Sequence, residues 1–522
     1  MSTSLKQRLT VLAQQPELLA NCLRGLEKEG LRTDLGGRYA LTPHPAQLGK
    51  ALTHPYVTTD YAEALLELIT ATHSSVDDLI QAADWVHRLT VNGLDNELIW
   101  GHSMPPVLPP ADDIPIAWYG TSNTGQLKHV YRRGLAHRYG KPMQCIAGIH
   151  YNFSLPDEFW ALFPSDEQNA QERQSAGYVA LIRNFMRHSW LLMYLFGASP
   201  ALNRSFLPNP PAELGRIGED TLYMPWATSL RMSDLGYTSE AQSTLTPCYN
   251  DLHTFLLRLY EAVTTPWPAY EAIGDQRDGE WIQINCNLLQ IENEYYSSIR
   301  PKRTARAKQR PINALMEDGV QYVEVRCLDI DPFEPAGISA QTARFLDAFL
   351  LHCALSDSPY FGDGGYCRES HQNFQTTVKE GRKPGLMLKR AEQPIALQAW
   401  AHEIFDDIQA CAEVLAQQTG DMDYVSAIQN ERLKVDDTTL TPSARVLAGI
   451  EAAGGSFQDF VLGLSRAHTE KFSKAGLSDS ELDEAHALRD ASIKAQAELE
   501  ADTSVTFDEY MQQFNTSLTR PS

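Results

Sequence analysis

Hydrophobic and polar positions along the chain follow two different periods. Apolar residues spaced three and four apart predict helices at about 4–26, 172–196, 247–263, 339–355 and 396–417. Alternation with period two predicts strands at Gly25–Arg32, Met143–Leu155, Trp281–Asn287 and Val320–Leu328. The segment 178–195 is apolar almost all round, so we expect this part of its helix to be buried.

The order of these segments predicts the fold class. Helices and strands do not alternate strictly, as they would in a doubly wound parallel sheet. We therefore expect an α+β fold, in which a mostly antiparallel, curved sheet is flanked by helices. From about residue 390 onward the pattern is almost entirely helical. We expect two regions: residues 1–389 with the sheet, and residues 390–522 as a helical region packed on the same unit.

A charged segment near the end of the chain, residues 478–502, begins with a pattern typical of a helix N-terminus. Ser478 stands three residues before Glu481, which is the spacing of a capping box. A solvated packing helix is the plain interpretation of this run, and a partner-binding surface is the alternative.

Composition limits the partners. The 522 residues are 43% hydrophobic and 21% charged, which is typical of a soluble globular protein. The formal net charge of -22 disfavours nucleic acid and anionic membranes. It also repels small anions, so a site for anionic ligands must supply its own positive charge or metal ions.

Cysteine usage and hydropathy predict the compartment. The eight cysteines are scattered and form no CxxC pair, which favours a reducing cytosol. The first residues lack the apolar core and cleavage site of a signal peptide. The most apolar stretch, Trp190–Leu202, is too short to span a bilayer. We expect a soluble, cytoplasmic protein.

Two segments carry closely spaced acids. Glu27 and Glu29 share one face of a predicted strand, where they repel each other unless a cation or a proton lies between them. A magnesium site is one interpretation, and a solvent-facing strand is the other. Asp60, Glu63 and Glu67 fit the outer face of an amphipathic helix. If this segment ends as a strand, Glu67 is instead partly buried and needs a partner.

A glycine-containing strand carries a histidine. One face of the predicted strand is polar around Gly148 and includes Gln144, His150 and Asn152. A glycine inside a strand often marks the close approach of a ligand or of another part of the chain. His150 is therefore either a ligand contact or a buried core histidine.

Basic residues follow in the next part of the chain. A run without acids can hold phosphates or form a mobile loop, and it comprises Arg300, Lys302, Arg303, Arg306, Lys308 and Arg310. From Arg306 onward we favour the mobile loop.

Glu324 and Arg326 share one strand face, either as an ion pair or as a metal ligand beside a phosphate clamp. No P-loop motif is present. Together these motifs predict a sheet face that holds magnesium ions and a polyphosphate.

Several segments resemble the proteobacterial glutamate–cysteine ligase family. The matching pieces run in order from about residue 20 to 390, and they include RGLEKEGLR, ALTHPYVTTDYAEALLELIT, YGTSNTGQLKHVYRRGL, GIHYNFSLP, ATSLRMSDLGY, LQIENEYYSSIRPKR and YVEVRCLDIDPF. The resemblance implies an active-site sheet of the glutamine synthetase type. The resemblance to the family is weak in the C-terminal third of the chain.

The resemblance also implies roles for individual residues. It implies a metal shell of Glu27, Glu29, Asp60, Glu67, His150 and Glu324. Glu324 and Arg326 are the expected catalytic residues, and Arg326, Arg300 and Arg303 are the expected phosphate contacts. The expected substrate-binding residues are Tyr131, Arg132, Gln144, Asn152, Arg231, Tyr237 and Tyr296.

The implied activity is ligation of the glutamate γ-carboxylate to cysteine. ATP and Mg²⁺ are the expected cofactors, with Mn²⁺ as a substitute for magnesium. Glutamate, cysteine and ATP are the expected partners, without nucleic acid or membrane, and the expected assembly is a monomer. One alternative is a ligase that joins glutamate to another small amine. The other is a non-catalytic relative that binds a nucleotide.

Overall fold

The centre of the fold is one antiparallel sheet. The computed structural model describes residues 2–521 except 208, 236–239, 244, 246, 307–308, 363–364 and 366. The strand order is β11-β12-β5-β1-β3-β2, with β4 also paired to β1, and every pairing is antiparallel. These strands are β1 (Leu23–Asp34), β2 (Val57–Thr59), β3 (Leu65–Ile69), β4 (Glu97–Ile99), β5 (Ile149–Ser154), β11 (Ile299–Lys302) and β12 (Tyr322–Leu328).

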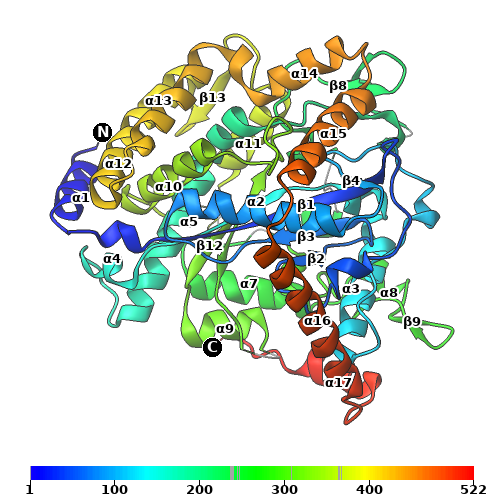
Figure 1. The fold of residues 1–522 in the computed structure, drawn as a ribbon. Helices are drawn as coiled ribbons and strands as arrows, with labels where there is room; N and C mark the ends of the chain where they lie inside the picture. Colours follow the sequence, from blue (N-terminus) through cyan, green and yellow to red (C-terminus); the bar gives the residue numbers. More distant parts are fainter. Residues whose placement is uncertain are drawn as a thin grey trace.

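Helices and short hairpins surround this sheet (Figure 1). The helices up to residue 380 are α1 (Thr3–Ala13), α2 (Val76–Gly93), α3 (Asn123–Tyr139), α4 (Asp157–Ala161), α5 (Ala170–Phe196), α6 (Glu240–Ser243), α7 (Leu252–Thr264), α8 (Pro268–Glu271), α9 (Pro311–Asp318), α10 (Ala340–Leu355) and α11 (Arg368–Glu380). The later helices are α12 (Leu397–Thr419), α13 (Asp423–Asp436), α14 (Pro442–Ala452), α15 (Phe457–Ala475), α16 (Asp479–Ala501) and α17 (Phe507–Thr516). The small strands are β6 (Ala201–Asn203), β7 (Gly215–Ile217), β8 (Thr221–Tyr223), β9 (Gln276–Arg277), β10 (Glu280–Trp281), β13 (Met387–Arg390) and β14 (Gln393–Ala396).

Helices cover one face of the sheet and leave the other face for polar side chains. Helix α2 packs on β1 and β3, and α5 packs on β11 and β12. Leu66 and Leu68 of β3 are buried in one cluster with Val86 and Leu89 of α2. Because side chains alternate along a strand, Glu67 points away from α2.

The predicted fold class is confirmed, and so are most of the long helices. The segments expected at 172–196, 339–355 and 396–417 correspond to α5, α10 and α12. The expected helical region after residue 390 is also observed. Ser478 and Glu481 form the predicted capping box at the start of α16. Among the described residues, no helix is long and apolar enough to cross a membrane.

Several predicted elements were too long: the helix expected from residue 247 begins at Leu252 of α7, and the strand expected from Val320 begins at Tyr322 of β12. The first helix ends at Ala13, because Pro16 follows and Glu17 adopts a left-handed backbone conformation with φ 56°. Strand β5 begins at Ile149 instead of Met143, since residues 142–145 form a 3₁₀ turn that starts at a proline. Gln144 is therefore not on a strand.

The strand predicted at Trp281–Asn287 is wrong beyond its first residue. Its polar side chains bond the backbone instead of facing one side of a sheet. Gln283 Nε2 donates to the carbonyl of Gly274 at 2.7 Å. Asn285 Nδ2 donates to the carbonyl of Gln290 at 3.1 Å. Such local bonds compete with ladder formation.

A buried charged network ties the sheet to the helices. Arg24 of β1 donates through Nε to Asp347 of α10 at 2.7 Å, and both side chains are fully buried. Tyr151 of β5 and Tyr424 of α13 donate their hydroxyls to the same carboxylate at 2.7 and 2.6 Å. The network therefore joins two strands to two helices.

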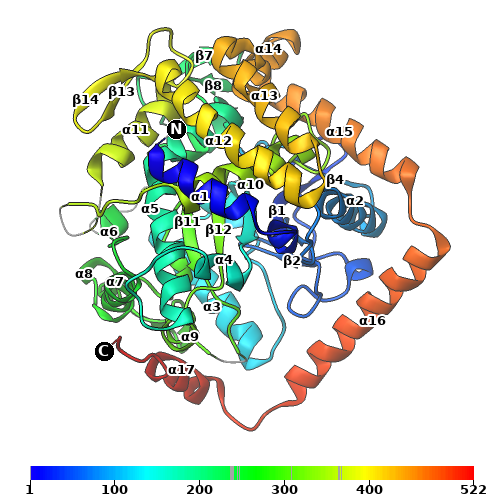
Figure 2. The same ribbon diagram turned by 90° about the vertical axis from the view of Figure 1, so that its left-hand side faces the viewer.

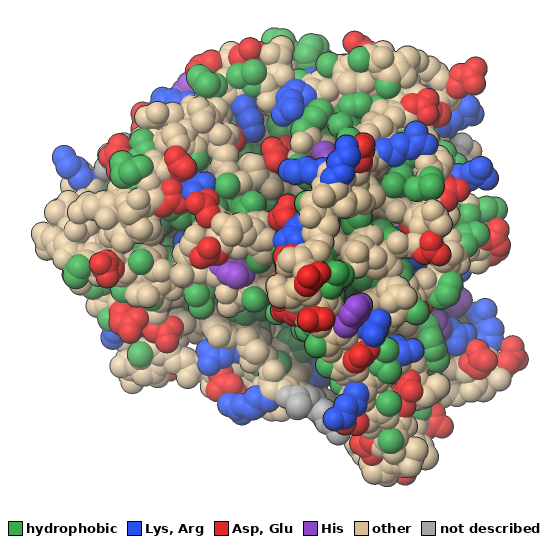
Figure 3. All heavy atoms as spheres, viewed as in Figure 1, with side chains coloured by type: hydrophobic (Ala, Val, Ile, Leu, Met, Phe, Trp, Pro, Cys, Tyr) green, Lys and Arg blue, Asp and Glu red, His purple; other side chains and the backbone are tan. Residues whose placement is uncertain are grey.

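Charged side chains at the surface are spread widely, unlike those of the buried network. On the face drawn in Figure 3, acidic and basic side chains are interspersed. The net charge of -22 is therefore not gathered into one acidic patch on this face.

Replacing Asp347 with Ala should destabilise the protein by about 3–5 kcal/mol, because Arg24 would remain buried without its counter-charge. Denaturant unfolding measures the loss. The control is Asp357→Ala, which breaks an ion pair to Arg8 at 3.3 Å where Asp357 is 60% exposed. The control should cost about 1 kcal/mol or less. Equal, small losses in both variants would contradict the assignment.

Candidate functional site

Three neighbouring strands bring two carboxylates and a histidine together. In the strand register, Glu27 of β1 faces His150 of β5, and Glu324 of β12 faces Asn152 of β5. Among the described residues, Glu27, His150 and Glu324 form a group with ligand atoms all within 4.8 Å of one another. His150 Nδ1 lies 3.1 Å from Glu27 Oε2. Carboxylate oxygens beside an imidazole nitrogen can hold a divalent cation.

A second acidic group adjoins the first. Glu29 of β1 lies directly opposite Glu67 of β3. His150 links the two groups, since its Nε2 is 3.7 Å from Glu29 Oε1. Burial, reinforced by the carboxylates of Glu27, Asp60 and Glu29, raises the pKa of Glu67 well above its usual value. Burial also raises the pKa of Glu29. Arg231 and Arg326 act on Glu29 and Lys128 acts on Glu67, but these positive charges do not outweigh burial and the neighbouring carboxylates.

Glu324, in contrast, has its own cations. Lys302 Nζ lies 3.1 Å from Glu324 Oε1, and Arg326 Nη1 lies 3.1 Å from Glu324 Oε2. Burial opposes the charge of Glu324, but Lys302, Arg326 and His150 outweigh it and hold its pKa well below the usual value. Glu324 is therefore ionised at neutral pH.

The guanidinium of Arg326 can take an additional anion. Its Nη1 lies 3.1 Å from Glu324 and 3.4 Å from His150 Nδ1. Within the described part of the chain, its buried Nε has no hydrogen-bond partner. Burial opposes the charge of Arg326, but the carboxylates of Glu324 and Glu29 raise its pKa. This arginine therefore keeps its charge beside the acidic cluster.

A small cavity opens beside the carboxylates. Its volume is about 150 Å³. Polar and aromatic side chains dominate its lining, which includes Glu29, Asp60, Tyr61, Tyr131, Arg132, Tyr139, Gln144, Asn293, Glu294, Tyr296, Arg300 and Arg326. Because Glu29, Asp60 and Arg326 also belong to the charged cluster, a small polar molecule in this cavity would lie next to it.

Helix α3 supplies part of the wall of this cavity. Arg132 donates through Nε to the carbonyl of Asp60. Its guanidinium lies over the ring of Tyr119, 4.7 Å from the centroid. The hydroxyl of Tyr119 donates to the Asp60 carbonyl at 2.9 Å. These contacts fix α3 against the loop that carries Asp60.

The opposite wall is also held by charged contacts. Glu294 accepts from the hydroxyl of Tyr139 at 2.6 Å and from Arg138 Nη1 at 3.1 Å. Arg300 is buried, and burial together with the neighbouring Arg326 lowers its pKa to about 10. The cavity is therefore built from side chains with defined partners on both sides.

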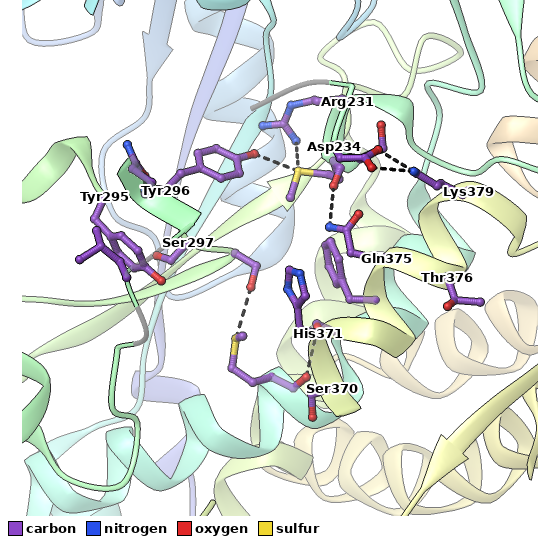
Figure 4. Close-up of a pocket in the computed structure, with 18 of the residues that line it drawn as sticks. Arg231, Asp234, Tyr295, Tyr296, Ser297, Ser370, His371, Gln375, Thr376 and Lys379 are labelled. Carbon is purple, nitrogen blue, oxygen red and sulfur yellow. Dashed lines mark hydrogen bonds and ion pairs between the residues drawn. The ribbon is translucent and has the colours of Figure 1, made fainter. Parts of the chain in front are cut away.

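A larger cavity of about 800 Å³ lies next to the small one and shares Tyr296 and Gln242 with it. Figure 4 shows Tyr296 and Arg231 on one side of this cavity, and His371, Gln375 and Lys379 of α11 facing them.

Arg231 braces the end of β12. It donates through Nη1 to the carbonyl of Leu328 at 3.1 Å and through Nη2 to that of Arg326 at 3.2 Å. A Cβ at Gly148 would lie 2.0 Å from Arg231 Nη2. The glycine expected to mark a close approach therefore admits an arginine of the same chain.

The remaining residues expected at the site are distributed as follows. Asn152 donates through Nδ2 to Glu27 Oε1 at 2.9 Å. Arg303 lies just beyond the end of β11. Tyr237 lies outside the described residues.

Several side chains of the site were not expected from the sequence, among them Tyr61, Tyr139, Asn293 and Glu294. Lys302 was expected only as part of the basic run; it stands two residues after Arg300 and so shares its strand face. Tyr139 and Glu294 meet across 155 positions of sequence. No local pattern predicts such a contact.

The matching family model and the similar sequences both belong to glutamate–cysteine ligases. The model of the glutamate–cysteine ligase family matches residues 9–377. A glutamate–cysteine ligase of Bordetella parapertussis is 57% identical over 522 residues, which cover 100% of this chain and 99% of the relative. One of Pseudomonas paraeruginosa is 53% identical over 523 residues and covers 99% of each chain.

Solved structures give the same result. A crystal structure of the Francisella tularensis glutamate–cysteine ligase in complex with AMP matches with a TM-score of 0.89 and 37% identity. The match covers 95% of this chain and 98% of that chain. A bifunctional glutathione synthetase from Pasteurella multocida matches with a TM-score of 0.69 and 25% identity, over 90% of this chain and 54% of that chain.

Replacing Glu67 with Gln should raise the melting temperature of the metal-free protein at about pH 8. The folded-state pKa of Glu67 lies above its usual value of 4.5, so the unfolded chain loses this proton first as the pH rises. The free energy of unfolding therefore decreases as the pH rises from the unfolded-state pKa of Glu67 to its folded-state pKa. The side-chain amide of Gln does not ionise, so the variant does not lose this stability. Thermal melts in EDTA measure the shift, which should shrink as the pH is lowered.

Glu63→Gln is the matched control for this experiment. Burial raises the pKa of Glu63 as well, but its carboxylate accepts from the backbone N–H groups of Trp118 at 2.6 Å and His44 at 2.9 Å, which favour the charged form, so the loss of these bonds should lower the melting temperature. Magnesium should stabilise the wild type and the control much more than Glu67→Gln. If Glu67→Gln melts below the wild type in EDTA, repulsion among the carboxylates is not the governing effect.

Proposed function

The chain belongs to the glutamate–cysteine ligase family, and on that premise we propose that it joins the γ-carboxylate of glutamate to the amine of cysteine at the cost of ATP. The products are γ-glutamylcysteine, ADP and phosphate, and the reaction is the first step of glutathione biosynthesis. One observation carries the proposal: the cluster of Glu27, His150, Glu324 and Arg326 lies beside a small polar cavity.

The chemistry requires two steps. A carboxylate is a poor acyl donor, so its γ-oxygen first attacks the terminal phosphorus of ATP and displaces ADP. The amine of cysteine then attacks the acyl carbon of the γ-glutamyl phosphate. Phosphate leaves with the electron pair of the broken C–O bond, and the amine loses a proton. The protein contributes by holding the reactants in line and by balancing their charge.

The acidic groups fit magnesium ions. Their ligand atoms are hard carboxylate oxygens with one imidazole, and burial together with the neighbouring carboxylates raises the pKa of Glu67, which a bound cation would offset. We assign the metal ions to Glu27, Glu29, Asp60, Glu67, His150 and Glu324. Bound magnesium would neutralise phosphate charge during transfer. Mn²⁺ should substitute, because it accepts the same oxygen ligands.

The basic residues would bind the phosphates. Arg326 is the proposed contact to the transferred phosphoryl group, because its guanidinium lies beside Glu324 and has an unpartnered Nε within the described chain. Arg300 and Arg303 are further candidates. The AMP bound to the Francisella tularensis relative supports nucleotide binding by this chain.

The small cavity would bind cysteine. Tyr131, Arg132, Gln144 and Tyr296 line it, and its volume of about 150 Å³ suits a small amino acid. Arg231, Tyr237 and Asn152 are assigned to the substrates on the family resemblance.

The regional division is also part of the proposal. We assign catalysis to residues 1–389 and a packing role on the same unit to residues 390–522. The family model ends at residue 377, close to this boundary, which supports the division.

The test of the function is ADP formation with glutamate and a panel of amines. Cysteine should be the best acceptor, followed by small analogues such as 2-aminobutyrate, because a pocket discriminates between similar side chains by only about 1–3 kcal/mol. Excess EDTA should abolish turnover. Better use of ammonia or glycine would support the alternative of another amine ligase. ATP binding without turnover on any amine would support the non-catalytic alternative.

Arg326→Ala should lower kcat on the order of 10³-fold while changing the KM for glutamate far less, since the guanidinium acts as charge shifts in the transition state. Arg326→Lys keeps the charge but loses the planar fork, so it should restore only part of the rate. Melting temperature and kcat are measured on the same preparations. A variant with lowered stability and near-normal kcat would identify a structural ion pair with Glu324.

A further inference from the structure

Helix α17 lies against both walls of the small cavity, although it belongs to the last part of the chain. Figure 2 shows α16 extending along one edge of the molecule and α17 returning to the body beside α9. Within α16, only Ser492 and Gln496 are buried among the described residues. The family model ends at residue 377, so it includes neither helix.

The first contact of α17 is with α3. Met511 is fully buried in one cluster with Val130 of α3 and Ile284. Tyr131, which lines the small cavity, packs against the same cluster. Asn123, at the start of α3, donates through Nδ2 to the carbonyl of Val505 at 2.9 Å. Helix α3 is therefore held at its first turn and at the turn that carries Tyr131.

The second contact is with the segment that forms the opposite wall. Arg310 lies over the ring of Phe514, 4.2 Å from the centroid, and donates to the Phe514 carbonyl at 3.1 Å. The same guanidinium pairs with buried Glu292 at 2.6 Å. Asn293 and Glu294, which follow directly, line the cavity.

We propose that α17 is a positioning element of the acceptor-amine cavity, in which Met511 acts through Tyr131 and Phe514 acts through Arg310 and Glu292. This inference rests on the proposed function, because it assumes that the small cavity binds cysteine. None of the α17 side chains lines the cavity. The two walls are bonded directly at the end of α3, where Tyr139 and Arg138 donate to Glu294. Helix α17 adds a second connection nearer the start of α3, and the two connections together restrain the distance between the walls.

The test is steady-state kinetics of the full chain with Met511→Ala. The KM for cysteine should rise about tenfold, with little change in kcat at saturating cysteine, because a looser pocket weakens the ground state and the transition state equally. The KM for ATP should stay within about twofold of the wild type, since α17 lies on the acceptor side. Met511→Leu, which nearly conserves volume, should restore the KM for cysteine.

Ile450→Ala is the control for a merely structural effect. Ile450 of α14 is also fully buried in the helical region, so its truncation should lower the melting temperature without changing the KM for cysteine.

Phe514→Leu is the second test variant, because Phe514 is half-buried and the change removes the ring that stacks on Arg310 without emptying a core position. It should raise the KM for cysteine about threefold, and it decides the question if Met511→Ala does not fold.

Two results would overturn the inference. One is an unchanged KM for cysteine in both variants. The other is an equal rise of the KM values for cysteine, glutamate and ATP, which indicates general loosening of the protein. A wild-type chain that forms no ADP with glutamate and cysteine would instead refute the proposed function, so the two failures are distinguishable.

Discussion

Repulsion among buried carboxylates is the constraint on which the arrangement of the site depends. The register of β1, β3, β5 and β12 holds these groups on one face of the sheet, and they cannot move apart without breaking strand pairing. Neighbouring positive side chains offset this repulsion to different extents at the different carboxylates. Lys302 and Arg326 balance Glu324, whereas Glu67 and Glu29 depend on a proton or an added cation. One half of the cluster therefore has its negative charge balanced by the protein's own cations, whereas the carboxylates of the other half are balanced incompletely.

Such a cluster requires a rigid support behind it. The opposite face of the sheet is covered by α2 and α5, and the pair of Arg24 and Asp347 fixes β1 to α10. Tyr424 extends this link into the helical region after residue 390. The strain of like charges on one face is thus resisted by packing and a buried ion pair on the other.

Period-two spacing was sufficient to predict which side chains share a strand face, as for Glu27 with Glu29. It could not give the register, since Glu27 meets His150 across 123 positions and this pairing depends on tertiary packing. The same spacing failed at Gln283 and Asn285, because amide side chains can bond the backbone and imitate a strand pattern. Tyr139 and Glu294 had no local signal at all.

The docking of α17 on α3 has a consequence for synthesis of the enzyme. Asn123 and Val505, which are hydrogen bonded, are 382 positions apart. At a ribosomal speed of 5–20 residues per second, α3 emerges about 20–80 seconds before the helix that supports it. A nascent chain can thus complete the carboxylate sheet well before α17 packs on α3. A chain truncated before α17 would therefore present the carboxylates without the helix that contacts both α3 and Arg310.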